Sequence, residues 1–192
     1  MNELNLSGYI PRAVSEPMEF YSFVSSERYK VMENESNLVA TELKKRGCLC
    51  FPLKGAFLIP DIYGDGRRRI SNDIDFLIQK KDAFSILKIM ESLGYEIGEF
   101  DPFTRKVVGY SREKRILWMR AMDNLPAFYK QMDCPYLDYM VIDFRHSINN
   151  NSDIVDRIFY KSSDGKMDLI SFYLHLCYHT HDEAVQYNAH NM

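Results

Sequence analysis

Apolar residues recur at helical spacing in the first quarter of the chain. Phe20, Phe23 and Val24 fall on one side of a helix, and similarly spaced apolar positions follow them. Three consecutive basic residues then precede Gly47, which is typical of a helix end, because cations favour the negative end of the helix dipole and glycine tolerates the left-handed cap. The pattern predicts helical structure over residues 16–46, as one helix or two, after an irregular arm.

Short apolar runs bounded by turn residues follow, and they predict strands and helices along the rest of the chain. Strands are expected at residues 48–53, 72–78 and 137–148, with edge strands within 95–121. Helices are expected at residues 55–63, over 82–93 and from 152 onward, with a loop or a broken helix at 122–136.

The predicted helix near residue 82 has the clearest end signals. Asp82 is expected to cap its first turn, and Gly94 is expected to end it. Its spacing predicts a core face made of Phe84, Leu87, Ile89, Met90 and Leu93.

Composition sets limits on the class of protein. The chain has 192 residues, of which 46% are hydrophobic, and this is enough for one compact core. The formal net charge of −3 gives no general attraction to nucleic acid or to an anionic membrane. No apolar run approaches the roughly 20 residues that span a bilayer. The first residues lack a signal-peptide pattern, and the four cysteines show no Cys-x-x-Cys pair, so we expect a cytoplasmic protein with reduced thiols.

Two aspartates separated by one apolar residue open the apolar stretch Asp73-Ile74-Asp75-Phe76-Leu77-Ile78. On a strand, residues two apart share a face, so Asp73 and Asp75 are expected to project together. Two adjacent carboxylates repel each other and resist burial unless a cation compensates them. Mg²⁺ prefers one or two carboxylates together with substrate phosphates. The pair therefore indicates metal-dependent phosphoryl or nucleotidyl chemistry, with a structural aspartate pair as the alternative.

Residues 53–95 carry several short motifs in a definite order. Lys54-Gly55 opens a predicted helix, Arg69 lies four residues before Asp73, and Leu93-Gly94-Tyr95 follows the next predicted helix. This order resembles the uncharacterised nucleotidyltransferase family of the polymerase-beta-like nucleotidyltransferase superfamily. Most of the superfamily carries Gly-Ser before the paired aspartates, whereas Lys54-Gly55 fits the subfamily but supplies no serine to hold a phosphate.

The resemblance extends more loosely to Asp143 and to residues 174–179. The family tends to have an acidic residue, one spacer and then a histidine near the end of a strand, but here two residues separate Asp143 from His146. Either Asp143 is the third carboxylate with a shifted histidine, or the site is incomplete. A structural ion pair of Asp143 with Arg145 or Arg157 is a further alternative.

The element pattern and the resemblance together imply an α/β (α+β) nucleotidyltransferase fold. We expect a small mixed β-sheet flanked by helices, with a helical C-terminal part. Within one unit, an N-terminal arm and helices would occupy residues 1–47, the nucleotidyltransferase core 48–150, and a C-terminal helical segment packed on the core 151–192.

The chemistry and the resemblance together imply roles for six residues. Asp73, Asp75 and Asp143 would bind metal, with one or two Mg²⁺ ions and the triphosphate of an NTP held by the first two. Asp143 would complete the site and act as base toward the acceptor hydroxyl, on a strand face shared with Tyr139, Val141 and Arg145.

The remaining residues would bind phosphate. Lys54 and Gly55 stand at a predicted helix start, where free N–H groups favour anions, and Lys54 adds a point charge. Arg69 would contact a phosphate oxygen or Asp73.

The implied activity is metal-dependent transfer of an NMP from an NTP, such as ATP, to a hydroxyl of a small molecule or a protein. A nucleic-acid acceptor is less favoured by the charge. The alternative is a catalytically degenerate nucleotide-binding or protein-interaction module of the same fold. His175, His179 and His181 also suggest a zinc site, since two histidines four residues apart share a helix face, but no third ligand is fixed, and these histidines are interpreted as structural.

Overall fold

The structure is a computed structural model that describes residues 12–53, 73–121, 124–148, 151–162 and 167–190. Its helices are α1 (Arg12–Lys45), α3 (Ala83–Ser92), α4 (Arg112–Ala121), α5 (Ser152–Lys161) and α6 (Leu169–His190), with one 3₁₀ turn, η4, at Lys80–Asp82. Its strands are β1 (Cys50–Pro52), β2 (Asp73–Ile78), β3 (Glu96–Asp101), β4 (Lys106–Gly109), β5 (Phe128–Cys134) and β6 (Leu137–Arg145).

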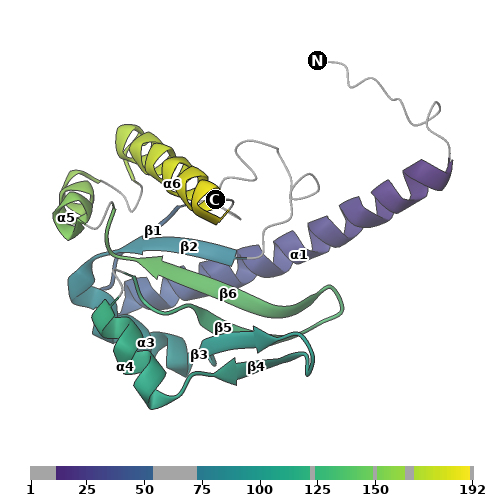
Figure 1. Cartoon of the computed structure of the whole chain (residues 1–192), viewed down its shortest axis with the longest axis horizontal. Helices are drawn as coiled ribbons and strands as arrows, with labels where there is room; N and C mark the ends of the chain where they lie inside the picture. Colours follow the sequence, from purple (N-terminus) through teal and green to yellow (C-terminus); the bar gives the residue numbers. More distant parts are fainter. Residues whose placement is uncertain (1–11, 54–72, 122–123, 149–150, 163–166, 191–192) are drawn as a thin grey trace.

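The six strands form one mixed sheet in the order β1-β2-β6-β5-β3-β4 (Figure 1). The pair of β2 and β6 is parallel, and the other neighbours are antiparallel. The predicted mixed α+β architecture is therefore confirmed, with a parallel strand pair at its centre.

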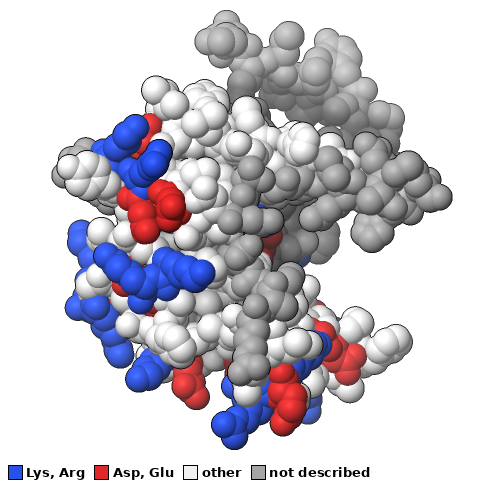
Figure 2. All heavy atoms as spheres, turned by 60° about the vertical axis from the view of Figure 1, so that its left-hand side comes forward, with Lys and Arg blue, Asp and Glu red and all other residues white. Residues whose placement is uncertain are grey.

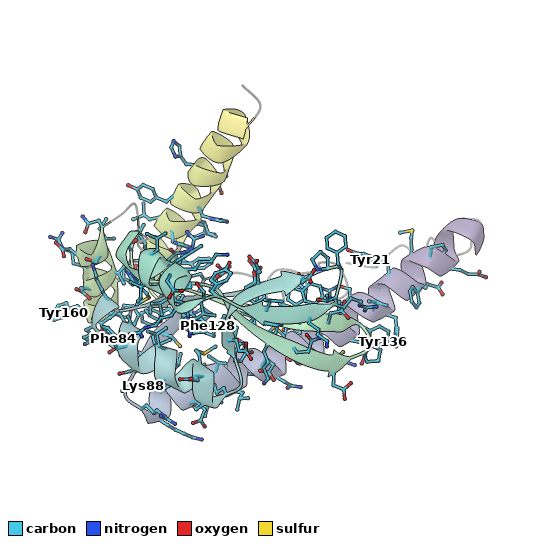
Figure 3. The ribbon with its side chains drawn as sticks, turned by 60° about the horizontal axis from the view of Figure 1, so that its bottom comes forward. Tyr21, Phe84, Lys88, Phe128, Tyr136 and Tyr160 are labelled. Atoms are coloured by element: carbon cyan, nitrogen blue, oxygen red, sulfur yellow. The ribbon has the colours of Figure 1, made fainter. Side chains whose placement is uncertain are left out.

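Side-chain alternation gives the sheet two different faces. Ile74, Phe76 and Phe144 pack with α1 and α3 in the larger hydrophobic cluster. Leu77, on the opposite face of β2, packs with Phe51 and with residues of α5 in a smaller cluster. In Figure 3, α1 and α6 accordingly lie on opposite sides of the sheet. Each cluster covers the sheet from one side, and β2 contributes to both.

Several predicted elements are confirmed. The strands expected at 48–53, 72–78 and 137–148 correspond to β1, β2 and β6, and the helices expected over 82–93 and from 152 onward correspond to α3, α5 and α6. The N-terminal helical region is one helix of 34 residues, α1, rather than two. Gly47 and Gly94 follow α1 and α3 with φ of +77° and +80°, as the predicted helix ends require. The helix expected at 55–63 lies outside the described residues.

Two stretches differ from the expectation. Residues 112–121, predicted as an edge strand, form helix α4, whose first turn is capped because the Lys114 N–H donates to Ser111 Oγ at 3.3 Å. Residues 128–134, predicted as a loop or a broken helix, form strand β5 between β6 and β3. The polar residues of β5 give it no apolar strand pattern, and the strand is instead stabilised by pairing with a neighbour on each side.

The start of α3 also corrects the sequence prediction. Asp82 occupies the N-cap position in a helical conformation, at the end of η4, and its side chain makes no cap hydrogen bond. Phe84 is 75% exposed, and Ala83 and Ile86 are buried in its place, together with the predicted Ile89 and Met90. The buried face of α3 therefore begins at Ala83, one position before the predicted Phe84.

A part-buried polar contact joins α1 to the sheet. Lys130 Nζ, on β5, donates to both carboxylate oxygens of Glu35, at 3.0 and 3.1 Å. The Tyr95 hydroxyl donates to the same carboxylate at 2.8 Å. Nearer the N-terminal end of α1, the ring of Phe23 packs edge-on against Tyr136 at the β5–β6 turn. This turn lies beside α1 in Figure 3. The helix is thus held to β5 at two levels.

The surface is electrostatically mixed. On the face seen in Figure 2, basic and acidic side chains of the described residues lie interspersed rather than in a patch of one sign. Among the described residues, no helix combines the length and the apolar character that crossing a membrane would require.

Candidate metal centre

The parallel pairing of β2 with β6 brings three aspartates together. Asp75 is the register partner of Asp143, and Asp73 is the partner of Val141. Because residues two apart on a strand share a face, all three carboxylates project from the same side of the sheet. This is the side opposite Ile74 and Phe76, which belong to the larger core.

The three carboxylates form a compact group. One ligand oxygen from each of Asp73, Asp75 and Asp143 lies within 4.8 Å of the other two. Asp75 is 2% exposed, and Asp73 and Asp143 are half-buried. Holding carboxylates this close in a partly desolvated place is unfavourable unless positive charge or hydrogen bonds compensate them.

The donor set fits a hard divalent cation. All three ligand groups are carboxylates, and oxygen ligands of this type suit Mg²⁺, Mn²⁺ or Ca²⁺ rather than the softer metals that prefer thiolate or imidazole. Two strands fix the three side chains, so the ligand positions are set by the sheet and not by a loop. These residues therefore suit the Mg²⁺ that the sequence analysis expected.

The predicted site residues divide into two groups. The structure brings Asp73, Asp75 and Asp143 together. Lys54, Gly55 and Arg69, the predicted phosphate-binding residues, lie outside the described residues, so their roles stay predictions.

A tyrosine beside the triad was missed at the level of sequence. Tyr129 on β5 is the register partner of Val141, two residues before Asp143 on β6. Burial, followed by the negative charge of Asp143, raises the pKa of the Tyr129 phenol above its usual value. No spacing motif in the sequence points to Tyr129, and its strand was predicted as a loop or a broken helix. The position of Tyr129 beside the triad follows only from the pairing of β5 with β6.

The histidines occupy other places in the fold. His175 is 4% exposed on α6, and its ring lies parallel to that of His179 at 6.3 Å between centroids. His146 is buried just after β6. Within the described ranges, three or more side chains that could hold a metal ion come together at the aspartate triad. The histidines do not form such a group there.

Comparison with known proteins assigns the family. No curated protein and no solved structure matches the chain significantly. A protein family described as "Uncharacterised nucleotidyltransferase" matches residues 1–189, which is almost the whole chain. The sheet of the described structure, with its paired and third aspartates, is consistent with that assignment. The chain therefore belongs to the uncharacterised nucleotidyltransferase family.

Proposed function

We propose that the protein is a Mg²⁺-dependent nucleotidyltransferase that moves an NMP from an NTP to a hydroxyl group of a small molecule or a protein. The observation that carries this proposal is the convergence of Asp73, Asp75 and Asp143 within 4.8 Å on one face of the sheet. The membership of the nucleotidyltransferase family supports it independently.

The three aspartates would have different roles in the reaction. When bound, Mg²⁺ stabilises the charge on the attacking and leaving oxygens of an in-line displacement. Asp73 and Asp75, which come from one strand, would hold the metal ions that bind the triphosphate. Asp143, on the neighbouring strand, would complete the metal site and accept the proton of the acceptor hydroxyl. The new bond joins the acceptor oxygen to the α-phosphorus, and the bond from that phosphorus to pyrophosphate breaks.

Three further residues belong to the proposal on sequence grounds. Lys54 and Gly55 follow β1, the strand beside β2, after one intervening residue, and they would bind the β- and γ-phosphates. Arg69 would pair with a phosphate oxygen or with Asp73. The phosphate-binding part of the site would thus lie on the β1 side of the aspartates.

Thermal unfolding with each of the four NTPs, with and without Mg²⁺, tests this function. A ligand that binds only the folded protein raises its stability, by about 2.7 kcal/mol at a hundredfold excess over Kd. We expect a Mg²⁺-dependent stabilisation by at least one NTP. It should be lost in Asp73→Asn/Asp75→Asn and retained in Asp133→Asn, a matched change at an exposed position of β5.

Transfer of label from an α-labelled NTP completes the same experiment. Asp143→Asn should lower this transfer by about a hundredfold or more, because general base catalysis contributes on that scale. No Mg²⁺-dependent stabilisation with any NTP would refute the proposed function. An NTP response together with transfer that Asp143→Asn leaves unchanged would refute the role of Asp143.

A further inference from the structure

Three aromatic rings form a continuous surface on the same side of the sheet as the aspartates. The rings of Phe100 on β3 and Tyr139 on β6 stack at 4.2 Å between centroids, and those of Tyr139 and Tyr129 lie 5.8 Å apart. The register places Tyr129 with Val141, in the same strand phase as Asp143. We call these three residues the aromatic surface.

The aromatic surface begins next to the metal-binding aspartates. Tyr129 is a diagonal cross-strand neighbour of Asp143, a position within reach of long side chains. Tyr139 lies four residues before Asp143 on β6, about 13 Å along the strand. The three rings therefore extend from the triad over a distance that a nucleoside-sized molecule can span.

These rings do not serve the hydrophobic cores. All three are half-buried, and none belongs to either of the two hydrophobic clusters that the described structure contains. Phe100 and Tyr139 cover one face of each other, but rings that stay partly open to solvent keep part of their surface available to a ligand, and aromatic side chains bind planar groups such as nucleobases.

A hollow adjoins the aromatic surface. It measures about 590 Å³, opens between β5 and the β3–β4 hairpin, and is lined by Tyr129, Gln131, Lys106 and Thr104 among others. Gln131 is held at both ends: its Oε1 accepts from the Val107 N–H at 3.1 Å, and its Nε2 donates to the Asp138 carbonyl at 2.9 Å. The hollow thus places mainly polar and charged groups beside the ring of Tyr129.

The position in the sheet indicates which substrate this surface serves. The strand order is β1-β2-β6-β5-β3, so the aspartates of β2 and β6 lie between β1 and the aromatic surface. Two of the proposed phosphate-binding residues, Lys54 and Gly55, come shortly after β1 in the sequence. The aromatic surface is on the Asp143 side, where the acceptor hydroxyl would give up its proton.

We propose that the aromatic surface binds the acceptor, and that this acceptor carries a planar ring, as a nucleoside or a phenol does. The inference rests on the proposed function, because it assigns the second substrate of the same reaction. The ring of the acceptor packs against the parts of Tyr139 and Tyr129 that stay open to solvent, and its hydroxyl reaches Asp143.

Binding of simple ring probes in the absence of NTP tests the inference. The probes are adenosine and tyramine, with ribose as the ring-free control, and their Kd values are measured by NMR titration. We expect both ring probes to bind more tightly than ribose, with shifts in the resonances of the aromatic surface. Tyr139→Leu and Phe100→Leu should each raise the Kd about tenfold, because stacking on an aromatic side chain contributes on that scale.

Two variants control for changes in folding. Tyr139→Phe keeps the ring and should bind the probes like the unsubstituted protein. Phe103→Leu changes an aromatic side chain that is 96% exposed, outside the aromatic surface, and should also have no effect. The inference is overturned if the ring probes bind no better than ribose, or if Tyr139→Leu binds them as well as Tyr139→Phe does.

A second titration separates the acceptor from the donor. Kd values for Mg–ATP and Mg–tripolyphosphate are compared between the unsubstituted protein and Tyr139→Leu. We expect no change in either. If Tyr139→Leu weakened the binding of Mg–ATP but not that of Mg–tripolyphosphate, the base of the donor nucleotide would bind at the aromatic surface. That result would overturn the acceptor assignment. Failure of the ring probes with an intact Mg–NTP response would refute only this inference, whereas absence of any Mg–NTP response would refute the proposed function.

Discussion

Asp75 is a nearly buried carboxylate in strand β2, whose residues other than Asp73 and Asp75 are apolar. Its neighbours Ile74 and Phe76 are fully buried on the opposite face, where they pack with α1 and α3. Because side chains alternate along a strand, β2 supplies apolar residues to the core on one side and carboxylates on the other. The position of Asp75 opposite Asp143 then depends on the register of two strands and not on a flexible loop.

The cysteines provide a test at the same scale. Burial, followed by the neighbouring Cys48, raises the pKa of the Cys50 thiol to about 12, whereas Cys177 is exposed on α6. Because the thiolate is the reactive form, Cys177 should be alkylated by iodoacetamide at pH 8 long before Cys50. The buried neutral thiol contributes stability that is complete below about pH 9 and is lost as the pH rises toward 12.

Peptide mass spectrometry over time measures this order of labelling. The variant Cys177→Ser serves as the control, since it should remove the fast phase and leave the slow one. Labelling of Cys50 at the same rate as Cys177 at pH 8 would contradict the burial seen in the structure.

At the scale of elements, α1 is tied to β5 through Glu35 and Lys130. The Glu35 side chain is 15% exposed and accepts hydrogen bonds from Lys130 and from Tyr95. Burial, followed by the charge of Glu35, accordingly raises the pKa of Tyr95 far above its usual value. Because water reaches this carboxylate poorly, its hydrogen bonds to Lys130 and Tyr95 are needed to offset the free-energy cost of burying it.

Lys130→Met should therefore destabilise the protein, by about 1–3 kcal/mol. The matched change Lys30→Met removes a pair with Glu27 whose side chains are 62% and 35% exposed, and it should alter stability by less than about 1 kcal/mol. Urea unfolding followed by circular dichroism gives both values. Equal effects of the two substitutions would show that the contact on β5 contributes no more than a surface ion pair.

The elements also show how far sequence patterns reach. Strands β2 and β6 and the aspartates they carry could be predicted, because an apolar run with two-residue periodicity marks a buried strand. Helix α4 could not, because Ile116 and Leu117 are exposed on it and no apolar helical stripe is visible. Strand β5 is rich in polar residues and is stabilised by its two neighbours, so only tertiary pairing reveals it. Tyr129 lies on β5, so its place beside Tyr139 and Asp143 could not be predicted for the same reason.

At the scale of the whole molecule, the sheet separates two hydrophobic clusters of unequal size. The larger lies between the sheet and α1 and α3, and the smaller joins β1 and β2 to α5. Phe76 and Leu77, adjacent on β2, belong to different clusters and are both fully buried. The two clusters should therefore unfold together.

Leu77→Ala tests this cooperativity. Removing a fully buried leucine side chain should lower the free energy of unfolding by about 2–5 kcal/mol. Leu174→Ala on α6, where the side chain is 56% exposed, should have a much smaller effect. Urea unfolding is followed by far-ultraviolet circular dichroism and by tryptophan fluorescence. A separate early transition in Leu77→Ala would show that the smaller cluster unfolds independently of the larger.

The parallel pairing of β2 with β6 has a consequence for folding. Asp75 and Asp143 are far apart in the sequence, and closing such a loop into a parallel pair is slow compared with forming local hairpins or helices. A slip of one residue would also turn the carboxylates toward the core, so the pairing is correct or absent. No partly folded chain can bring the three aspartates together, and the candidate metal centre therefore forms only once β2 and β6 have paired.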